Sequence, residues 1–102
     1  MDESIVASLR ELAEPLAVLS ISHLSSDTRR RLAGDHLSVN AYPSEFGGFV
    51  YVGAPRYRIP AEPDLAVIFE AAELAGIVWL KFDSDAAVID GLQVHDDSDL
   101  NT

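Results

Sequence analysis

With 102 residues, of which 48% are hydrophobic, the chain has the length and composition of one folded domain rather than of a disordered acidic segment. Its 17 acidic and 7 basic residues give a formal net charge of −10 at pH 7, which repels nucleic acid and attracts basic surfaces. The absence of cysteine excludes disulfides and thiolate chemistry. No apolar run approaches the ~20 residues that cross a membrane, and the acidic N-terminus does not resemble a secretion signal. We therefore expect a cytoplasmic protein without membrane association.

Two helices and a strand are predicted in the first third of the chain. Residues 3–14 form an amphipathic pattern that the following proline ends. Residues 16–21 predict a strand, with continuation of the helix as the alternative. A second helix of two to three turns is predicted, with Ser25 or Ser26 as the N-cap, Asp27 in the first turn and Gly34 at its end. The apolar face of the first helix consists of Ile5, Leu9, Leu12 and Ala13.

A hairpin is predicted in the middle of the chain. Residues 37–42 alternate between apolar and polar side chains, as a half-buried strand does. Residues 43–48 are rich in turn-forming types, and residues 49–52 predict the second strand. We expect Gly47 and Gly48 to supply positive φ angles in the turn.

The clearest pattern is a helix followed directly by a strand. Residues 63–75 begin with proline, which suits the first helical position, and continue with apolar residues at steps of three and four. Gly76 ends the helix, and the β-branched and aromatic residues 77–82 predict a strand. We expect the helix and the strand to bury three large side chains together: Leu65, Phe69 and Trp79.

The last segment predicts two further short strands. Residues 86–89 form a return strand, residues 92–94 a final one, and residues 96–102 an acidic tail that frays. The predicted order is α-β-α-β-β-α-β-β. The fold class is therefore α+β, with a mainly antiparallel sheet of four to five strands and two to three helices packed on it. We expect residues 1–102 to form one compact domain.

No motif for catalysis or cofactor binding is present, such as a phosphate-binding glycine loop, a nucleophile elbow or a zinc-binding helix. Three groups of residues have the side-chain types of a functional site. They are Asp83, Asp85 and Asp90 as calcium ligands, Ser22, His23 and Asp27 as a hydrolytic triad, and Arg29, Arg30 and Arg31 as phosphate contacts. The spacing favours simpler interpretations, namely an acidic turn, local capping and a solvated basic face or ion pairs. We expect no enzymatic activity, no metal and no cofactor.

The distribution of charge is the most informative functional feature. Residues 1–60 carry seven acidic and six basic residues, a net charge of −1, whereas residues 61–102 carry ten acidic residues and Lys81, a net charge of −9. Carboxylates spread along one edge of a protein can occupy a basic groove in place of nucleic acid. The expected partner-binding residues are Glu62, Asp64, Glu70, Glu73, Asp83, Asp85 and Asp90.

Several short segments resemble a family of small uncharacterised proteins encoded on bacterial plasmids and integrative conjugative elements. The similar segments are Ser22-His23-Leu24, Ala41-Tyr42-Pro43 with Gly48-Phe49-Val50-Tyr51-Val52, and Trp79-Leu80-Lys81-Phe82-Asp83 with Ile89-Asp90-Gly91-Leu92. The resemblance implies a gene on a mobile element, among accessory genes that often include antirestriction and anti-CRISPR proteins. It implies no catalytic residues.

Two hypotheses of different classes follow. In the first, the protein is a non-enzymatic inhibitor of a bacterial defence system, of the anti-CRISPR or antirestriction type, and acts as an acidic DNA mimic. It blocks a basic nucleic-acid-binding or subunit surface and does not itself bind nucleic acid. In the alternative, it is an accessory protein of a mobile element that acts as a structural or regulatory interaction module, with a homodimer as one form. The salt dependence of partner binding distinguishes the two.

Overall fold

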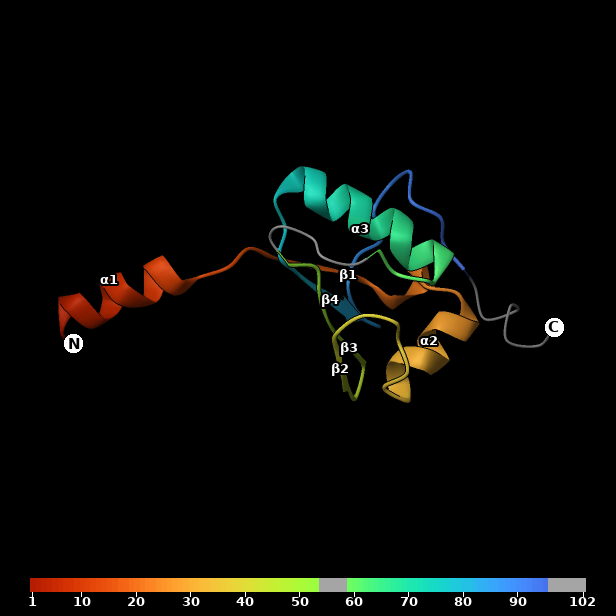
Figure 1. Ribbon diagram of the computed structural model, residues 1–102, viewed down its shortest axis with the longest axis horizontal. Helices are drawn as coiled ribbons and strands as arrows, with labels where there is room; N and C mark the ends of the chain where they lie inside the picture. Colours follow the sequence, from red (N-terminus) through yellow and green to blue (C-terminus); the bar gives the residue numbers. More distant parts are fainter. Residues whose placement is uncertain (54–58, 96–102) are drawn as a thin grey trace.

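The computed structural model describes residues 1–53 and 59–95 and shows an α+β fold, with helices α2 and α3 on one face of a four-stranded sheet (Figure 1). The predicted tail, residues 96–102, and the segment 54–58 lie outside the described residues. Among the described residues, no helix is long and apolar enough to cross a membrane. The elements are α1 (Glu3–Leu12), β1 (Leu16–Ser20), the short 3-10 helix η1 (Ile21–His23), α2 (Ser26–Ala33), β2 (Ala41–Ser44), β3 (Gly47–Tyr51), α3 (Pro63–Ala75) and β4 (Trp79–Asp83).

The sheet has the strand order β1-β4-β3-β2 and is mainly antiparallel, as predicted. β4 pairs antiparallel with β3, and β3 with β2, whereas β1 runs parallel to β4. The parallel pair places Leu19 opposite Phe82, and the neighbouring antiparallel pair places Val50 opposite Leu80. The latest and the earliest strands of the chain are therefore direct neighbours in the sheet.

The helices α2 and α3 begin and end where the sequence predicts. Ser25 caps α2, because its hydroxyl accepts a hydrogen bond from the backbone N–H of Thr28. Pro63 is the first residue of α3, and Gly76 ends α3 in the left-handed conformation, with φ of 74°. The ends of both helices are therefore determined by residues within or next to the helices themselves.

The core lies between the sheet and these two helices. Leu65 and Phe69 of α3 are buried with Leu80 and Phe82 of β4, as expected. The prediction that Trp79 joins them is wrong, because Trp79 is only half-buried and lies on the other face of the sheet. Successive side chains of a strand point to opposite faces, so the inward positions of its neighbours place Trp79 outward.

The hairpin is present, but its turn differs from the prediction. Glu45 and Phe46 form the turn. β2 (Ala41–Ser44) begins later than the predicted strand 37–42 and overlaps it only at Ala41 and Tyr42. β2 is an edge strand and therefore tolerates Pro43, which cannot donate a ladder hydrogen bond. Gly47 has a φ of 154°, whereas Gly48 is not among the glycines with positive φ, so that part of the expectation is wrong.

The two glycines are required by close packing rather than by the turn. A Cβ atom at Gly47 would lie 1.9 Å from the carbonyl oxygen of Phe82 on the neighbouring strand. A Cβ atom at Gly48 would lie 2.9 Å from Leu32 of α2 and 2.9 Å from the Tyr42 carbonyl oxygen. The absence of side chains lets β3 approach β4 and lets α2 approach the sheet.

The first helix does not pack on the sheet, in contrast to the other two. The carboxylate of Asp2 caps α1, and hydrogen bonds from the backbone N–H and then the hydroxyl of Ser4 lower its pKa. No residue of α1 is buried, and the helix extends away from the rest of the molecule (Figure 1). The radius of gyration is 15.0 Å, compared with about 13 Å for a compact domain of this size.

The predicted strands at residues 86–89 and 92–94 are not strands. The segment between Asp83 and His95 instead runs past β1 and η1 and is held by single hydrogen bonds. His23 is buried, its Nε2 accepts from the backbone N–H of Ile89 at 2.8 Å, and its Nδ1 lies 2.9 Å from the Gln93 carbonyl oxygen. Since Nε2 accepts, the neutral ring donates from Nδ1. Hydrogen bonds to the His23 side chain thus hold this segment in place of pairing with a strand.

We expect Phe69→Ala to destabilise the protein by roughly 3–5 kcal/mol, because it leaves a cavity at the centre of the core. Val67→Ala, on the exposed side of the same helix, is the control and should change stability by less than about 0.5 kcal/mol. Urea unfolding of both variants and the parent measures the difference. Equal midpoints for the two variants would contradict the position of α3.

We expect the double variant Gly47→Val and Gly48→Val to melt well below the parent, because both new side chains collide with backbone atoms. Ser44→Val on β2, where the side chain is exposed, serves as the control and should melt close to the parent. Thermal unfolding followed by circular dichroism measures the shift. Unchanged melting of the double variant would refute the close approach of β3 to β4.

We expect His23→Ala to destabilise the protein by roughly 1–3 kcal/mol, because the Ile89 N–H and the Gln93 carbonyl lose their partner. Hydrogen exchange should accelerate at the amide of Ile89 before it does so in the sheet. His36→Ala removes an exposed histidine at the end of α2 and should leave both measurements unchanged. Unaltered exchange at residue 89 in the His23 variant would disprove this role of the ring.

Candidate functional site

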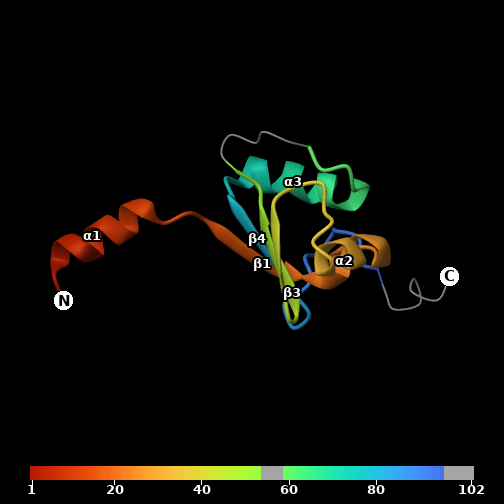
Figure 2. The same cartoon turned by 60° about the horizontal axis from the view of Figure 1, so that its bottom comes forward.

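The face of the sheet opposite α2 and α3 is not covered by any described helix (Figure 2). We call it the open sheet face. The pairing of the strands places Trp79 between Leu16 and Tyr51, and Lys81 between Val18 and Phe49. The residues of the open sheet face are Leu16, Val18, Tyr42, Phe49, Tyr51, Trp79 and Lys81.

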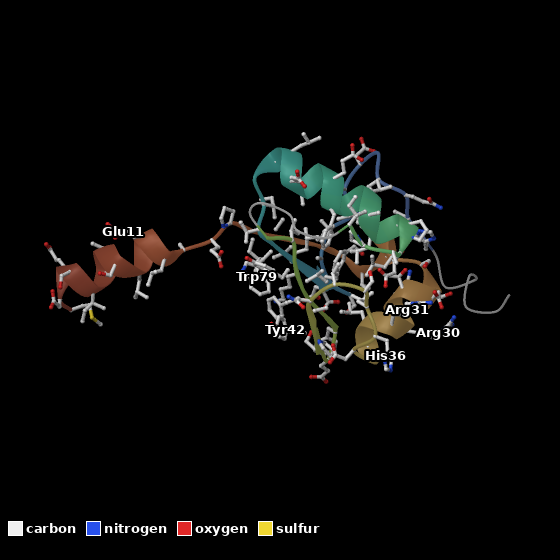
Figure 3. The ribbon with its side chains drawn as sticks, viewed as in Figure 1. Glu11, Arg30, Arg31, His36, Tyr42 and Trp79 are labelled. Atoms are coloured by element: carbon white, nitrogen blue, oxygen red, sulfur yellow. The ribbon has the colours of Figure 1, made fainter. Side chains whose placement is uncertain are left out.

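Three aromatic rings are in contact on this face. Tyr51 lies directly opposite Trp79, and their ring centroids are 4.8 Å apart at an interplanar angle of 58°. Tyr42 lies 6.1 Å from Trp79 and is largely exposed (Figure 3). Aromatic clusters of this kind are enriched at protein interfaces, since they offer large rigid contact areas. The sequence analysis expected Trp79 in the core and did not identify this cluster.

The face carries little positive charge. Lys81 is its one cation among the described residues, and its Nζ lies 5.7 Å from the centroid of the Phe49 ring and 3.8 Å from the carboxylate of Asp83. Surfaces that bind single-stranded nucleic acid combine stacking aromatic rings with a basic groove. In a chain of net charge −10, the aromatic cluster therefore favours a protein partner over a nucleic acid.

The carboxylates that were expected to bind a partner fall into two groups. Glu70 and Glu73 are exposed on α3, and Asp85 and Asp90 are exposed in the segment after β4. Asp83 is half-buried, and its Oδ1 accepts a hydrogen bond from the backbone N–H of Asp85 at 2.8 Å. The exposed members of the predicted acidic surface therefore lie on α3 and the following segment.

Glu62 and Asp64 form the second group, whose carboxylates bond within the fold; Asp64 is half-buried. Glu62 is only 4% exposed, and its carboxylate accepts hydrogen bonds from the backbone N–H and the hydroxyl of Ser38. Asp64 accepts from the backbone N–H of Ser25 and from the hydroxyl of Thr28, both at 2.8 Å. These carboxylates attach the first turn of α3 to α2 and to the loop before β2, where the helix dipoles favour negative charge.

The residue types of a hydrolytic triad do not form one. His23 has both ring nitrogens bonded to backbone groups, and the Ser22 hydroxyl lies 2.7 Å from that of Ser20. Asp27 forms ion pairs with Arg30 and Arg31 along α2. Among the residues that the structure describes, no three His, Asp or Glu side chains are grouped so that they could hold a metal ion.

The basic run on α2 is used within the molecule. The Nε of Arg29 donates to the Leu24 carbonyl at 2.8 Å, and the Nη2 of Arg29 donates to the His95 carbonyl at 2.7 Å. Arg30 and Arg31 lie at the exposed side of α2 beside Asp27 (Figure 3). Arg29 thus helps to hold the C-terminal segment, and the other two arginines are partly neutralised.

No curated protein and no solved structure matches this chain. A family model described as the C-terminal domain of DUF5983, a family of unknown function, matches residues 16–97. The match begins with β1, so that α1 lies outside it. This match confirms the resemblance to an uncharacterised family, and it covers most of the chain. The protein therefore belongs to DUF5983, a family of unknown function.

Proposed function

We propose that this protein is a cytoplasmic, non-enzymatic inhibitor of a bacterial defence complex, of the anti-CRISPR or antirestriction type. It docks an acidic surface on a basic nucleic-acid-binding or subunit surface of that complex. The observation that supports this proposal best is the position of the carboxylates. Glu70 and Glu73 are exposed on α3, and Asp85 and Asp90 are exposed in the segment after β4. Lys81, the one cation of residues 61–102, lies on the other side of the sheet.

The outer side of α3 combines charge with exposed apolar area. Val67 is 57% exposed and lies three residues before Glu70 on the helix. Leu74 is 84% exposed and lies four residues after Glu70 and next to Glu73. Protein interfaces commonly combine apolar contacts with a charged rim. We define the outer α3 surface by four residues, Val67, Glu70, Glu73 and Leu74.

The carboxylates would act mainly on the rate and selectivity of association. Glu70 and Glu73 are three residues apart, which places them as neighbours on the helix surface. Duplex DNA presents one negative charge per ~1.7 Å of axis, and a groove built for it attracts any comparable set of anions. The attraction is screened over ~8–10 Å at physiological salt, so binding should weaken as ionic strength rises.

A structural or regulatory interaction module is the second candidate function. The observation that favours it is the open sheet face, whose aromatic cluster is not covered by any described helix (Figure 2). This function would use apolar contact and would depend only weakly on salt, because apolar burial is not screened.

We expect Glu70→Lys combined with Glu73→Lys to weaken inhibition roughly tenfold or more, because it reverses the charges that face the partner. The control is Glu11→Lys combined with Glu45→Lys, two exposed positions away from α3, which raises the net charge by the same amount, from −10 to −6. The assay measures target DNA binding by purified surveillance and restriction complexes, with each protein added at increasing salt.

The proposal requires that the α3 variant loses potency while the control variant keeps it. Equal potency of the two variants would show that total charge, and not the outer α3 surface, determines binding. If the parent inhibits no complex across a broad panel, the inhibitor hypothesis is rejected in favour of the interaction module.

A further inference from the structure

Two apolar surfaces of this chain have no partner within the described residues. One is the face of α1 formed by Ile5, Leu9 and Leu12, which are 51%, 63% and 75% exposed. The other is the open sheet face, where Val18 is 54% exposed beside the aromatic cluster. An amphipathic helix owes most of its stability to the burial of its apolar face, so an isolated ten-residue helix is marginal in water.

The two surfaces match in size. α1 has ten residues and is therefore about 15 Å long. The strands β1, β3 and β4 have five residues each and are therefore about 16–17 Å long. They also match in charge, since α1 contains Glu3, Arg10 and Glu11, a net charge of −1, and the charged residue of the open sheet face is Lys81.

The connection between α1 and β1 directs the helix away from its own sheet. The Pro15 carbonyl accepts hydrogen bonds from the backbone N–H groups of Val78 and Trp79, and the Glu14 carboxylate accepts from the Trp79 indole at 3.1 Å. Ala13 is extended, with φ of −66° and ψ of 142°, and Glu14 precedes a proline, which disfavours the helical conformation. A reversal over the same sheet would have to occur in these restricted residues.

We propose that α1 of one chain packs on the open sheet face of a second copy of the chain, which returns the same contact, so that a symmetric dimer forms by exchange of helices. Each copy then covers both of its apolar surfaces, and the extended connection spans the two bodies without bending. The chain supplies both sides of this contact: α1, which extends away from the sheet, and a sheet face that no described helix covers (Figures 1 and 2). The dimer leaves the outer α3 surface free and is thus independent of the proposed inhibition.

The single tryptophan provides a direct probe, since Trp79 lies at the centre of the open sheet face. We expect the parent to sediment at twice the chain mass of 11.1 kDa and its tryptophan emission to shift to longer wavelength on dilution. Leu9→Lys on α1 and Val18→Lys on β1 should each give a monomer with red-shifted emission and an unchanged circular dichroism spectrum of the sheet. Leu74→Lys, an exposed leucine on α3, is the matched control and should remain a dimer.

Mixing the two monomeric variants identifies the exchange. The Val18→Lys chain keeps an intact α1 and the Leu9→Lys chain keeps an intact sheet face, so one of the two contacts can form and a heterodimer should appear. A monomeric parent would overturn the proposal, whether or not α1 packs on its own sheet. A parent dimer that survives both lysine substitutions, or the absence of a heterodimer in the mixture, would also overturn it. None of these results affects inhibition through α3, which the double variant Glu70→Lys and Glu73→Lys tests separately.

Discussion

The packing of α3 against one face of the sheet is the interaction on which the rest of the structure depends. Phe69 and Leu65 of α3 and Phe82 and Leu80 of β4 are all nearly inaccessible to solvent and belong to the same core. Because strand side chains alternate, this core uses only every second residue of β3 and β4. The remaining residues of these strands face the other way, and they include the aromatic residues Phe49, Tyr51 and Trp79.

Buried and half-buried polar side chains connect distant segments of the chain around this core. Glu62, Asp64, His23 and Arg29 each bond to backbone or hydroxyl groups of segments that are distant in the sequence. Such groups are costly to bury without partners, so each of them specifies how a loop meets the sheet or α2. The same residue types would suggest catalysis or partner binding if they were exposed. In this protein these side chains instead bond to groups within the fold.

The outer α3 surface and the open sheet face differ in chemistry and lie on opposite sides of the molecule. The outer α3 surface is acidic with two exposed apolar residues, and is suited to a basic partner. The open sheet face is aromatic and nearly uncharged, and is suited to an apolar helix such as α1. The proposed dimer and the proposed inhibitory contact are therefore compatible, since neither contact needs the residues of the other.

Local sequence determined the elements that depend on local chemistry. Pro63 and Gly76 delimit α3, Ser25 caps α2, and the period of the apolar residues places Phe69 in the core, because capping and periodicity act within a few residues. The α+β class follows from these elements. Tertiary structure alone decided where the strands meet and which side chains they expose. Only the tertiary structure determines the late start of β2, the outward position of Trp79 and the burial of Glu62. It also determines that hydrogen bonds to His23 hold the last segment in place of the two predicted strands. The last three of these features depend on neighbours that are 24 to 70 residues away in the chain, and no local pattern records such a neighbour.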